Sequence, residues 1–189
     1  MPRLPQIVLL VCLLAACWLA MQIVHEFGHV LAAWWTGGVV DKVVLRPWTI
    51  SQTQLSRNPE PLTVAWAGPV IGAALPLLAW LTAKLLRIPG AYLLRFFAGF
   101  CLISNGVYLG AGTLENVGDA GDLQRHGSFA WLLFLFAVVA VPSGIWLWHN
   151  QGRHFGFGGA GGHVDDWAIA ACVTTMFVLL GLELLLGLH

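Results

Sequence analysis

The segment His25-Glu26-Phe27-Gly28-His29 has the residue types and spacing that suit metal-assisted hydrolysis. On a helix, residues four apart lie on one face a turn apart, so both imidazoles can bind a single Zn²⁺. Glu26 directly follows the first histidine, where its carboxylate can take a proton from an attacking water without binding the metal itself. The pattern predicts two metal ligands, His25 and His29, and one catalytic residue, Glu26.

These polar residues lie within an apolar run, from Ile7 to about Trp35, that is long enough to cross a membrane. Ionisable side chains inside a membrane span are costly and tend to mark functional sites. The alternative is a polar patch that pairs with other spans, for example Glu26 with Arg95. The membrane setting favours the metal site over a chance match to the HExxH pattern.

A zinc hydrolase usually has three protein ligands and one open coordination position. Residues 115–122 contain the acidic cluster that lies near the end of an apolar run, and Asp119 comes just beyond the end of the third run. Because the second span returns across the membrane, the first and third spans end on the same side, at one level. Asp122 and His126 are alternatives that could share a helical face with Asp119, and Glu60 is a weaker candidate.

The composition predicts a membrane protein. Hydrophobic residues make up 58% of the 189 residues, charged residues 10%, the formal net charge is zero, and the mean hydropathy is +0.78. A soluble domain has about 25% charged and 45–50% apolar residues. These values exclude a soluble enzyme, a disordered chain and a nucleic-acid-binding protein, which needs a basic face. The lipid bilayer is therefore an expected partner, and nucleic acid is not.

Five apolar runs predict an all-α polytopic membrane protein with about five transmembrane helices. They cover residues 7–35, 62–86, 91–114, 128–148 and 167–186. Between the first two runs, a β-branched stretch after Gly37-Gly38 predicts a short strand or hairpin. Leu14-Ala15-Ala16-Cys17 resembles a lipoprotein cleavage site, but the apolar run continues beyond it, and we expect no cleavage there.

The chain divides into two predicted parts. Residues 1–127 form a membrane core with three spans, the HExxH motif and the aspartate, and residues 128–189 add two transmembrane helices. The loop that connects these two helices, residues 150–166, is rich in glycine and histidine and is expected to be a flexible surface segment. The alternative for this loop is a second metal site formed by His149, His154, His163 and Asp165.

Three motifs in order make residues 7–125 resemble the site-2 protease family of intramembrane zinc metalloproteases. They are the HEFGH segment at 25–29 inside a span, Ala67-Gly68-Pro69 after a strand-like insertion, and the segment 118–123, which is similar to the family's Asp-Gly motif. The resemblance implies that His25, His29 and Asp119 bind zinc and that Glu26 is the catalytic glutamate. It also implies a multi-pass protein, of a prokaryotic cell membrane, whose substrate is a transmembrane segment of another protein.

The sequence departs from the family pattern in two motifs. Ala120 stands where the family has a glycine, and Ile71-Gly72 stands where an asparagine often follows the Ala-Gly-Pro motif. These departures leave Asp122 as a rival third ligand and leave open a catalytically inactive relative that acts as a membrane-helix-binding adaptor or chaperone. A second enzymatic alternative is a membrane-anchored protease of the HExxH-plus-ExxxD type with Glu115 as ligand, but such enzymes place zinc in a cytosol-facing helical domain.

A transmembrane helix must unwind locally before its backbone can be cleaved. The strand predicted at residues 39–46 could hold the unwound segment by β-augmentation. A simple connector between the first two spans is the alternative.

Overall fold

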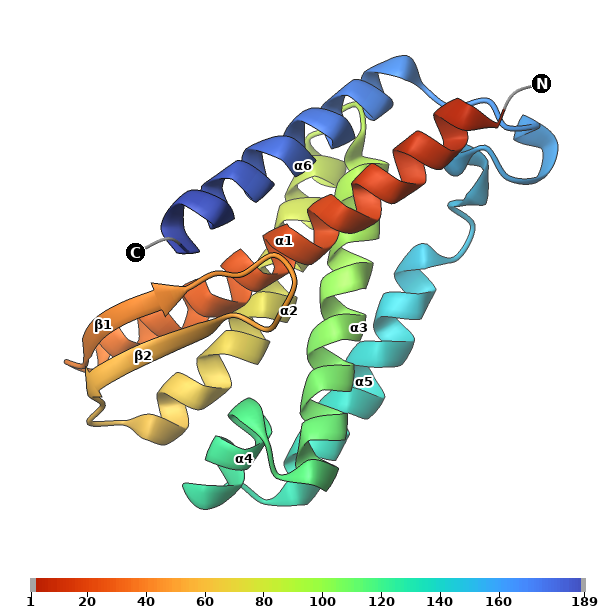
Figure 1. Cartoon of the computed structure of the whole chain (residues 1–189). Coiled ribbons are helices and arrows are strands. Elements are labelled where there is room, and N and C mark those ends of the chain that lie inside the picture. Colours follow the sequence, from red (N-terminus) through yellow and green to blue (C-terminus); the bar gives the residue numbers. More distant parts are fainter. Residues whose placement is uncertain (1–2, 188–189) are drawn as a thin grey trace.

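The structure, a computed structural model, describes residues 3–187 and is mainly helical (Figure 1). Its elements in chain order are α1 (Leu4–Trp35), β1 (Val39–Val44), β2 (Gln52–Arg57), α2 (Pro61–Leu85), α3 (Ala91–Glu115), α4 (Gly118–Arg125), α5 (Ala130–Trp148) and α6 (Asp166–Gly187). Five of these helices, all except α4, are long and apolar enough to cross a membrane. The predicted all-α polytopic fold with a hairpin after the first helix is confirmed, and the protein is a multi-pass integral membrane protein.

Large apolar side chains remain exposed along the spans, as a lipid environment requires. Val138 on α5 and Val178 on α6 are 68% and 61% exposed. On a soluble protein such a surface would be an association site. In a bilayer, lipid tails cover it, and the helices meet each other through smaller residues.

The backbones of α1 and α2 come close together at glycines. A Cβ on Gly28 would collide with the backbone of Ala67 and Gly68, and a Cβ on Gly68 would collide with the imidazoles of His25 and His29. Small residues are the usual means by which membrane helices approach closely. This contact places the HExxH face of α1 directly against the Ala-Gly-Pro segment of α2.

The remaining long helices pack around α1 and α3. α3 packs between α2 and α5, and α6 lies along α1, where Cys12 and Cys17 cluster with Ala168 and Cys172 (Figure 1). The division of the chain at residue 127 stays a prediction.

β1 and β2 form an antiparallel two-stranded sheet beside the C-terminal half of α1 (Figure 1). Val40 lies opposite Leu55, and Val44 lies opposite Gln52. Because the sheet has two strands, one edge of β2 has no strand partner within it. The hairpin thus brings an open strand edge to the part of α1 that carries the HExxH motif.

The segment 150–166 is more ordered than a flexible connector. It contains two short 3₁₀ turns, Gly152–Phe155 and Gly158–Ala160. Phe155 is buried, and its carbonyl oxygen accepts a hydrogen bond from Nε2 of Gln6 at 2.9 Å. One aromatic anchor and one amide therefore fasten this glycine-rich segment to the beginning of α1.

Candidate metal centre

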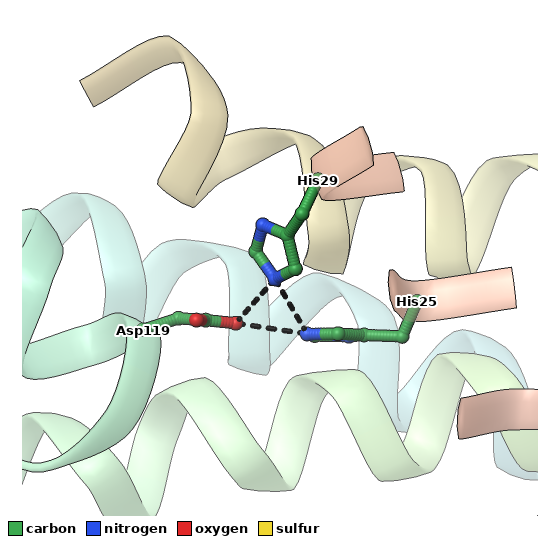
Figure 2. A group of neighbouring side chains, drawn as sticks. All are labelled: His25, His29 and Asp119. Atoms are coloured by element: carbon green, nitrogen blue, oxygen red, sulfur yellow. Dashed lines mark hydrogen bonds and ion pairs between the residues drawn. The ribbon is translucent and has the colours of Figure 1, made fainter. Parts of the chain in front are cut away.

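His25 and His29 on α1 meet Asp119 on α4, although 90 residues separate His29 from Asp119 (Figure 2). Oδ2 of Asp119 lies 2.8 Å from Nε2 of His25 and 3.3 Å from Nε2 of His29, and the two Nε2 atoms are 3.1 Å apart. One ligand atom from each residue lies within 4.8 Å of the others. The structure brings together the three side chains that the resemblance implies as ligands.

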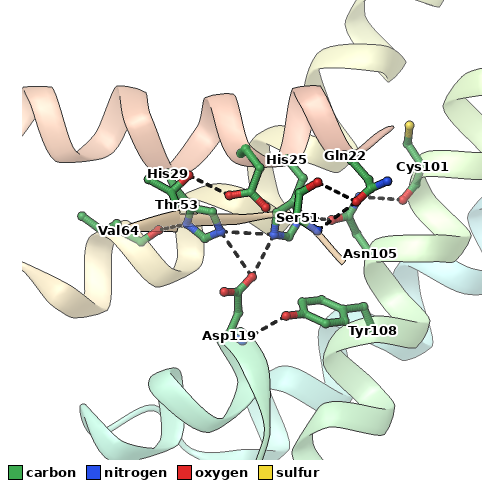
Figure 3. Close-up of polar contacts among 11 residues, drawn as sticks. Gln22, His25, His29, Ser51, Thr53, Val64, Cys101, Asn105, Tyr108 and Asp119 are labelled. Atoms are coloured by element: carbon green, nitrogen blue, oxygen red, sulfur yellow. Dashed lines mark hydrogen bonds and ion pairs between the residues drawn. The ribbon is translucent and has the colours of Figure 1, made fainter. Parts of the chain in front are cut away.

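The other nitrogen of each imidazole is held by an oxygen acceptor (Figure 3). Nδ1 of His29 donates to the Val64 carbonyl at 2.8 Å, and Nδ1 of His25 donates to Oδ1 of Asn105 at 2.7 Å. Nδ2 of Asn105 donates to the Cys101 carbonyl at 2.9 Å, which fixes the amide with its oxygen toward His25. Because these oxygens only accept, each Nδ1 carries the hydrogen, and in a neutral ring Nε2 presents its lone pair to the centre.

This set of donor atoms fits a divalent cation. Two nitrogen lone pairs and one carboxylate oxygen point at one another and repel unless a positive charge lies between them. Burial raises the pKa of Asp119, but when protons rather than a metal occupy the Nε2 atoms, hydrogen bonds with His25 and His29 outweigh burial and hold this pKa well below its usual range. The carboxylate is therefore ionised at neutral pH, and two imidazoles with one carboxylate form a ligand set known from catalytic zinc sites.

The position of Asp119 depends on a tyrosine from α3. The Asp119 backbone N–H, at the start of α4, donates to the Tyr108 hydroxyl at 3.3 Å. Gly118 has a φ of 56°, and a Cβ there would collide with the Tyr108 hydroxyl. Ala120 is buried, and its methyl group packs against Gly112 of α3. Ala120, which stands where the family has a glycine, therefore contributes its methyl group to the packing of α4 against α3.

Glu26 is 4% exposed, and its Oε2 accepts a hydrogen bond from Oγ1 of Thr53 on β2 at 2.7 Å. The alternative pairing with Arg95 is not formed, because Arg95 donates to the His149 carbonyl at 3.1 Å. Thr53 therefore orients the carboxylate beside the ligands.

The hairpin is fastened to α1 one turn before the motif. Oε1 of Gln22 accepts hydrogen bonds from the backbone N–H of Ser51 at 2.9 Å and from its hydroxyl at 2.7 Å. Nε2 of Gln22 donates to the Arg46 carbonyl at 3.4 Å. Sequence reasoning did not assign roles to Gln22, Thr53, Asn105 or Tyr108, although the lone amide of Gln22 within an apolar run was a signal.

The alternative third ligands lie away from the centre. Asp122 forms an ion pair with Arg125, and its side chain is 51% exposed. Nδ1 of His126 donates to the Asp122 carbonyl at 2.8 Å, and Glu60 and Glu115 are exposed. Across residues 3–187, one group of three such side chains has its ligand atoms close enough to bind a metal ion, and it is His25, His29 and Asp119.

The proposed second metal site in the glycine-rich loop is therefore not supported within the described residues. The ring of His154 stacks on Tyr92 at a centroid distance of 4.5 Å. The Tyr92 hydroxyl donates to Oδ2 of Asp165 at 3.4 Å. These residues anchor the loop to α3.

A comparison with protein families matches the Peptidase M50B-like family over residues 6–109, more than half of the chain. The chain belongs to this family. The resemblance to the site-2 proteases is thus confirmed, and the protein falls within a family of membrane metallopeptidases. The match covers α1, the hairpin, α2 and most of α3 of this M50B-like protein but ends before α4. The assignment of Asp119 as the third ligand therefore depends on its distances to His25 and His29. No curated protein and no solved structure matches the chain.

Proposed function

We propose that this M50B-like protein is an intramembrane zinc metalloprotease that hydrolyses peptide bonds in or near transmembrane segments of other membrane proteins. The observation that supports the proposal most strongly is the convergence of Asp119 from α4 on Nε2 of His25 and His29. The HExxH motif of α1 supplies two ligands by itself. Asp119 comes from a different helix, and with it the group has the three ligands that a zinc hydrolase needs.

His25, His29 and Asp119 would hold the zinc ion. When bound, zinc polarises a carbonyl oxygen and makes water a stronger acid at neutral pH. The protein contributes the orientation of the ligands: Asn105 and the Val64 carbonyl hold the two imidazoles with Nε2 inward. Partners of this kind fix ring orientation and raise metal affinity.

Glu26 acts as the general base toward the attacking water and then delivers the proton to the leaving amine. Its place next to His25 and the hydrogen bond from Thr53 keep the carboxylate beside the ligands. The carboxylate is buried, so few waters compete for it.

The substrate would lie unwound along β2. A cavity of about 710 Å³ contains the three ligands and Glu26, and β2 contributes Gln52, Thr53 and Leu55 to its wall. An extended peptide can add to an unpaired strand edge through main-chain hydrogen bonds. The strand expected at 39–46 corresponds to β1, which pairs with β2, so we assign the substrate-facing role to β2.

The test is Glu26→Gln, with Glu115→Gln as the matched control. We expect Glu26→Gln to keep about one zinc per chain and to lose about 10³-fold or more in cleavage, since the base is gone while the ligands remain. Glu115 is exposed at the end of α3, so its variant should match wild type in both respects. Zinc content is measured on detergent-purified protein, and cleavage by mass spectrometry of synthetic single-span peptides in liposomes.

Two outcomes contradict the proposal. A wild-type protein without zinc and without cleavage would favour the inactive adaptor. Loss of zinc in Glu115→Gln would favour the ExxxD type of site.

A further inference from the structure

Two cavities of different character meet at Glu26. The two cavities share five lining residues: His25, Glu26, Ile50, Ser51 and Tyr108. The first cavity, of about 710 Å³, is the polar compartment, to which Asn58, Asp119, Asp122 and His126 also contribute. The second, of about 390 Å³, is the apolar compartment, to which Trp18, Met21, Ile103 and Val107 also contribute.

The apolar compartment lies between α1 and α3 and offers few polar groups to a ligand. Nε1 of Trp18 donates to the Pro47 carbonyl at 2.8 Å, and Oε1 of Gln22 accepts from Ser51. The Asn105 amide is bound to His25 and to the Cys101 carbonyl. With these polar atoms already paired, the compartment favours an apolar occupant.

The two compartments also differ in depth. Trp18 precedes Glu26 by eight residues of α1, so the apolar compartment extends about 12 Å along the helix away from the motif, toward the middle of the span. The polar compartment leads to α4, which is outside the membrane-crossing helices; there His126 is exposed and the Asp122 side chain is half-exposed. The cleft therefore runs from the apolar part of the molecule to its aqueous end, with Glu26 at the junction.

On the basis of the proposed protease function, we infer that the apolar compartment is a substrate subsite that takes a bulky apolar side chain next to the scissile bond. The residues on the other side of that bond would lie in the polar compartment. A volume of about 390 Å³ accommodates a leucine or phenylalanine side chain, and it falls within the range of small-ligand pockets. The substrate class is then a segment cut where an apolar transmembrane stretch turns polar.

The experiment uses N-acetylated hydroxamates of alanine, leucine and phenylalanine as probes, with zinc-loaded protein in detergent and calorimetry as the readout. The hydroxamate group binds the metal, so the three compounds differ in the side chain alone. We expect the leucine and phenylalanine compounds to bind wild type about tenfold or more tightly than the alanine compound, because each buried carbon adds affinity.

Val107→Phe fills the apolar compartment, and Val138→Phe is the matched control. Val107 is 52% exposed, so a larger side chain can be accommodated, and Val138 on α5 lines neither compartment. We expect Val107→Phe to lose the preference for leucine and phenylalanine while binding the alanine compound like wild type. Val138→Phe should keep the preference. Met21→Ala enlarges the same compartment and should favour phenylalanine over leucine more strongly than wild type does.

An unchanged preference in both Val107→Phe and Met21→Ala would overturn the subsite. Equal affinity of zinc-loaded wild type for all three compounds would also overturn it, while leaving the proposed metal centre in place. Failure of every hydroxamate to bind wild type in the presence of zinc would instead contradict the metal centre, and the subsite with it.

Discussion

Asn105 gives His25 the support that a backbone carbonyl gives His29. The asparagine that often follows the Ala-Gly-Pro motif in the family is absent from α2, where Ile71-Gly72 stands instead. A Cβ at Gly72 would lie 2.9 Å from both Oδ1 and Nδ2 of Asn105. The space freed by this glycine is therefore filled by an amide from α3, and that amide binds His25.

Asn105→Leu removes the acceptor for Nδ1 of His25 and leaves that N–H buried without a partner. We expect zinc affinity to fall about 10–100-fold, as is typical when the partner of a ligating histidine is lost. Asn105→Asp keeps an oxygen acceptor and should retain more of the affinity than the leucine variant. Competition with a chromogenic chelator measures both. Wild-type affinity in Asn105→Leu would show that His25 needs no such support.

For single residues, the sequence predicts a role where that role depends on spacing within one helix. The spacing of His25 and His29 defines their shared face without any knowledge of packing. The order of the spans placed the acidic cluster at residues 115–122 level with the histidines, and the resemblance to the family singled out Asp119 within that cluster. Tyr108 and Asn105 could not be assigned, because their roles depend on which faces of α3 meet α1 and α4.

The element that decides the geometry of the imidazoles is α2. Its Gly68 lies against both rings, and Gly28 of α1 lies against the backbone of the same turn. The rings therefore fill a space that exists because neither helix has a side chain there. The two imidazoles therefore keep their orientation only if the backbones of α1 and α2 stay this close.

Gly68→Ala introduces a methyl group that would overlap the imidazoles of His25 and His29. Either α2 moves away or the rings turn, and in both cases we expect zinc affinity to fall more than about tenfold, by analogy with other losses of ligand support. The matched control is Gly181→Ala on α6, where an added Cβ meets nothing within 4 Å. This control should bind zinc like wild type and be slightly more stable, since alanine favours helix over glycine. Equal zinc affinity in the two variants would contradict this role of α2.

The helices and strands that the sequence predicts correctly are those marked by a long run of one residue type. The five spans follow from long apolar runs, and the hairpin follows from a β-branched stretch after two glycines. The order in segment 150–166 was missed because composition alone suggested flexibility. Phe155, a single large apolar residue in a glycine-rich stretch, was the available signal, and its burial anchors the loop.

At the scale of the whole molecule, the metal would act as a cross-link. α1 and α4 are far apart in the chain, and Asp119 meets α1 through the two histidines. A ligand that binds the folded state and spans two elements adds its binding free energy to the stability of the fold. Stability in the presence of zinc should therefore report which carboxylate completes the centre.

Two variants, Asp119→Ala and Asp122→Ala, test which carboxylate completes the metal centre. The two aspartates are three residues apart on the same short helix. With zinc at about 100 times its dissociation constant, we expect the thermal unfolding midpoint of the wild-type protein to rise by about 5–10 °C. Asp119→Ala should lose this rise, because one ligand is gone and the two Nε2 atoms remain without an anionic partner. Asp122→Ala should keep it, because the Asp122 side chain is exposed and paired with Arg125. The midpoints are measured by scanning fluorimetry with and without zinc, and the opposite pattern would transfer the role of third ligand to Asp122.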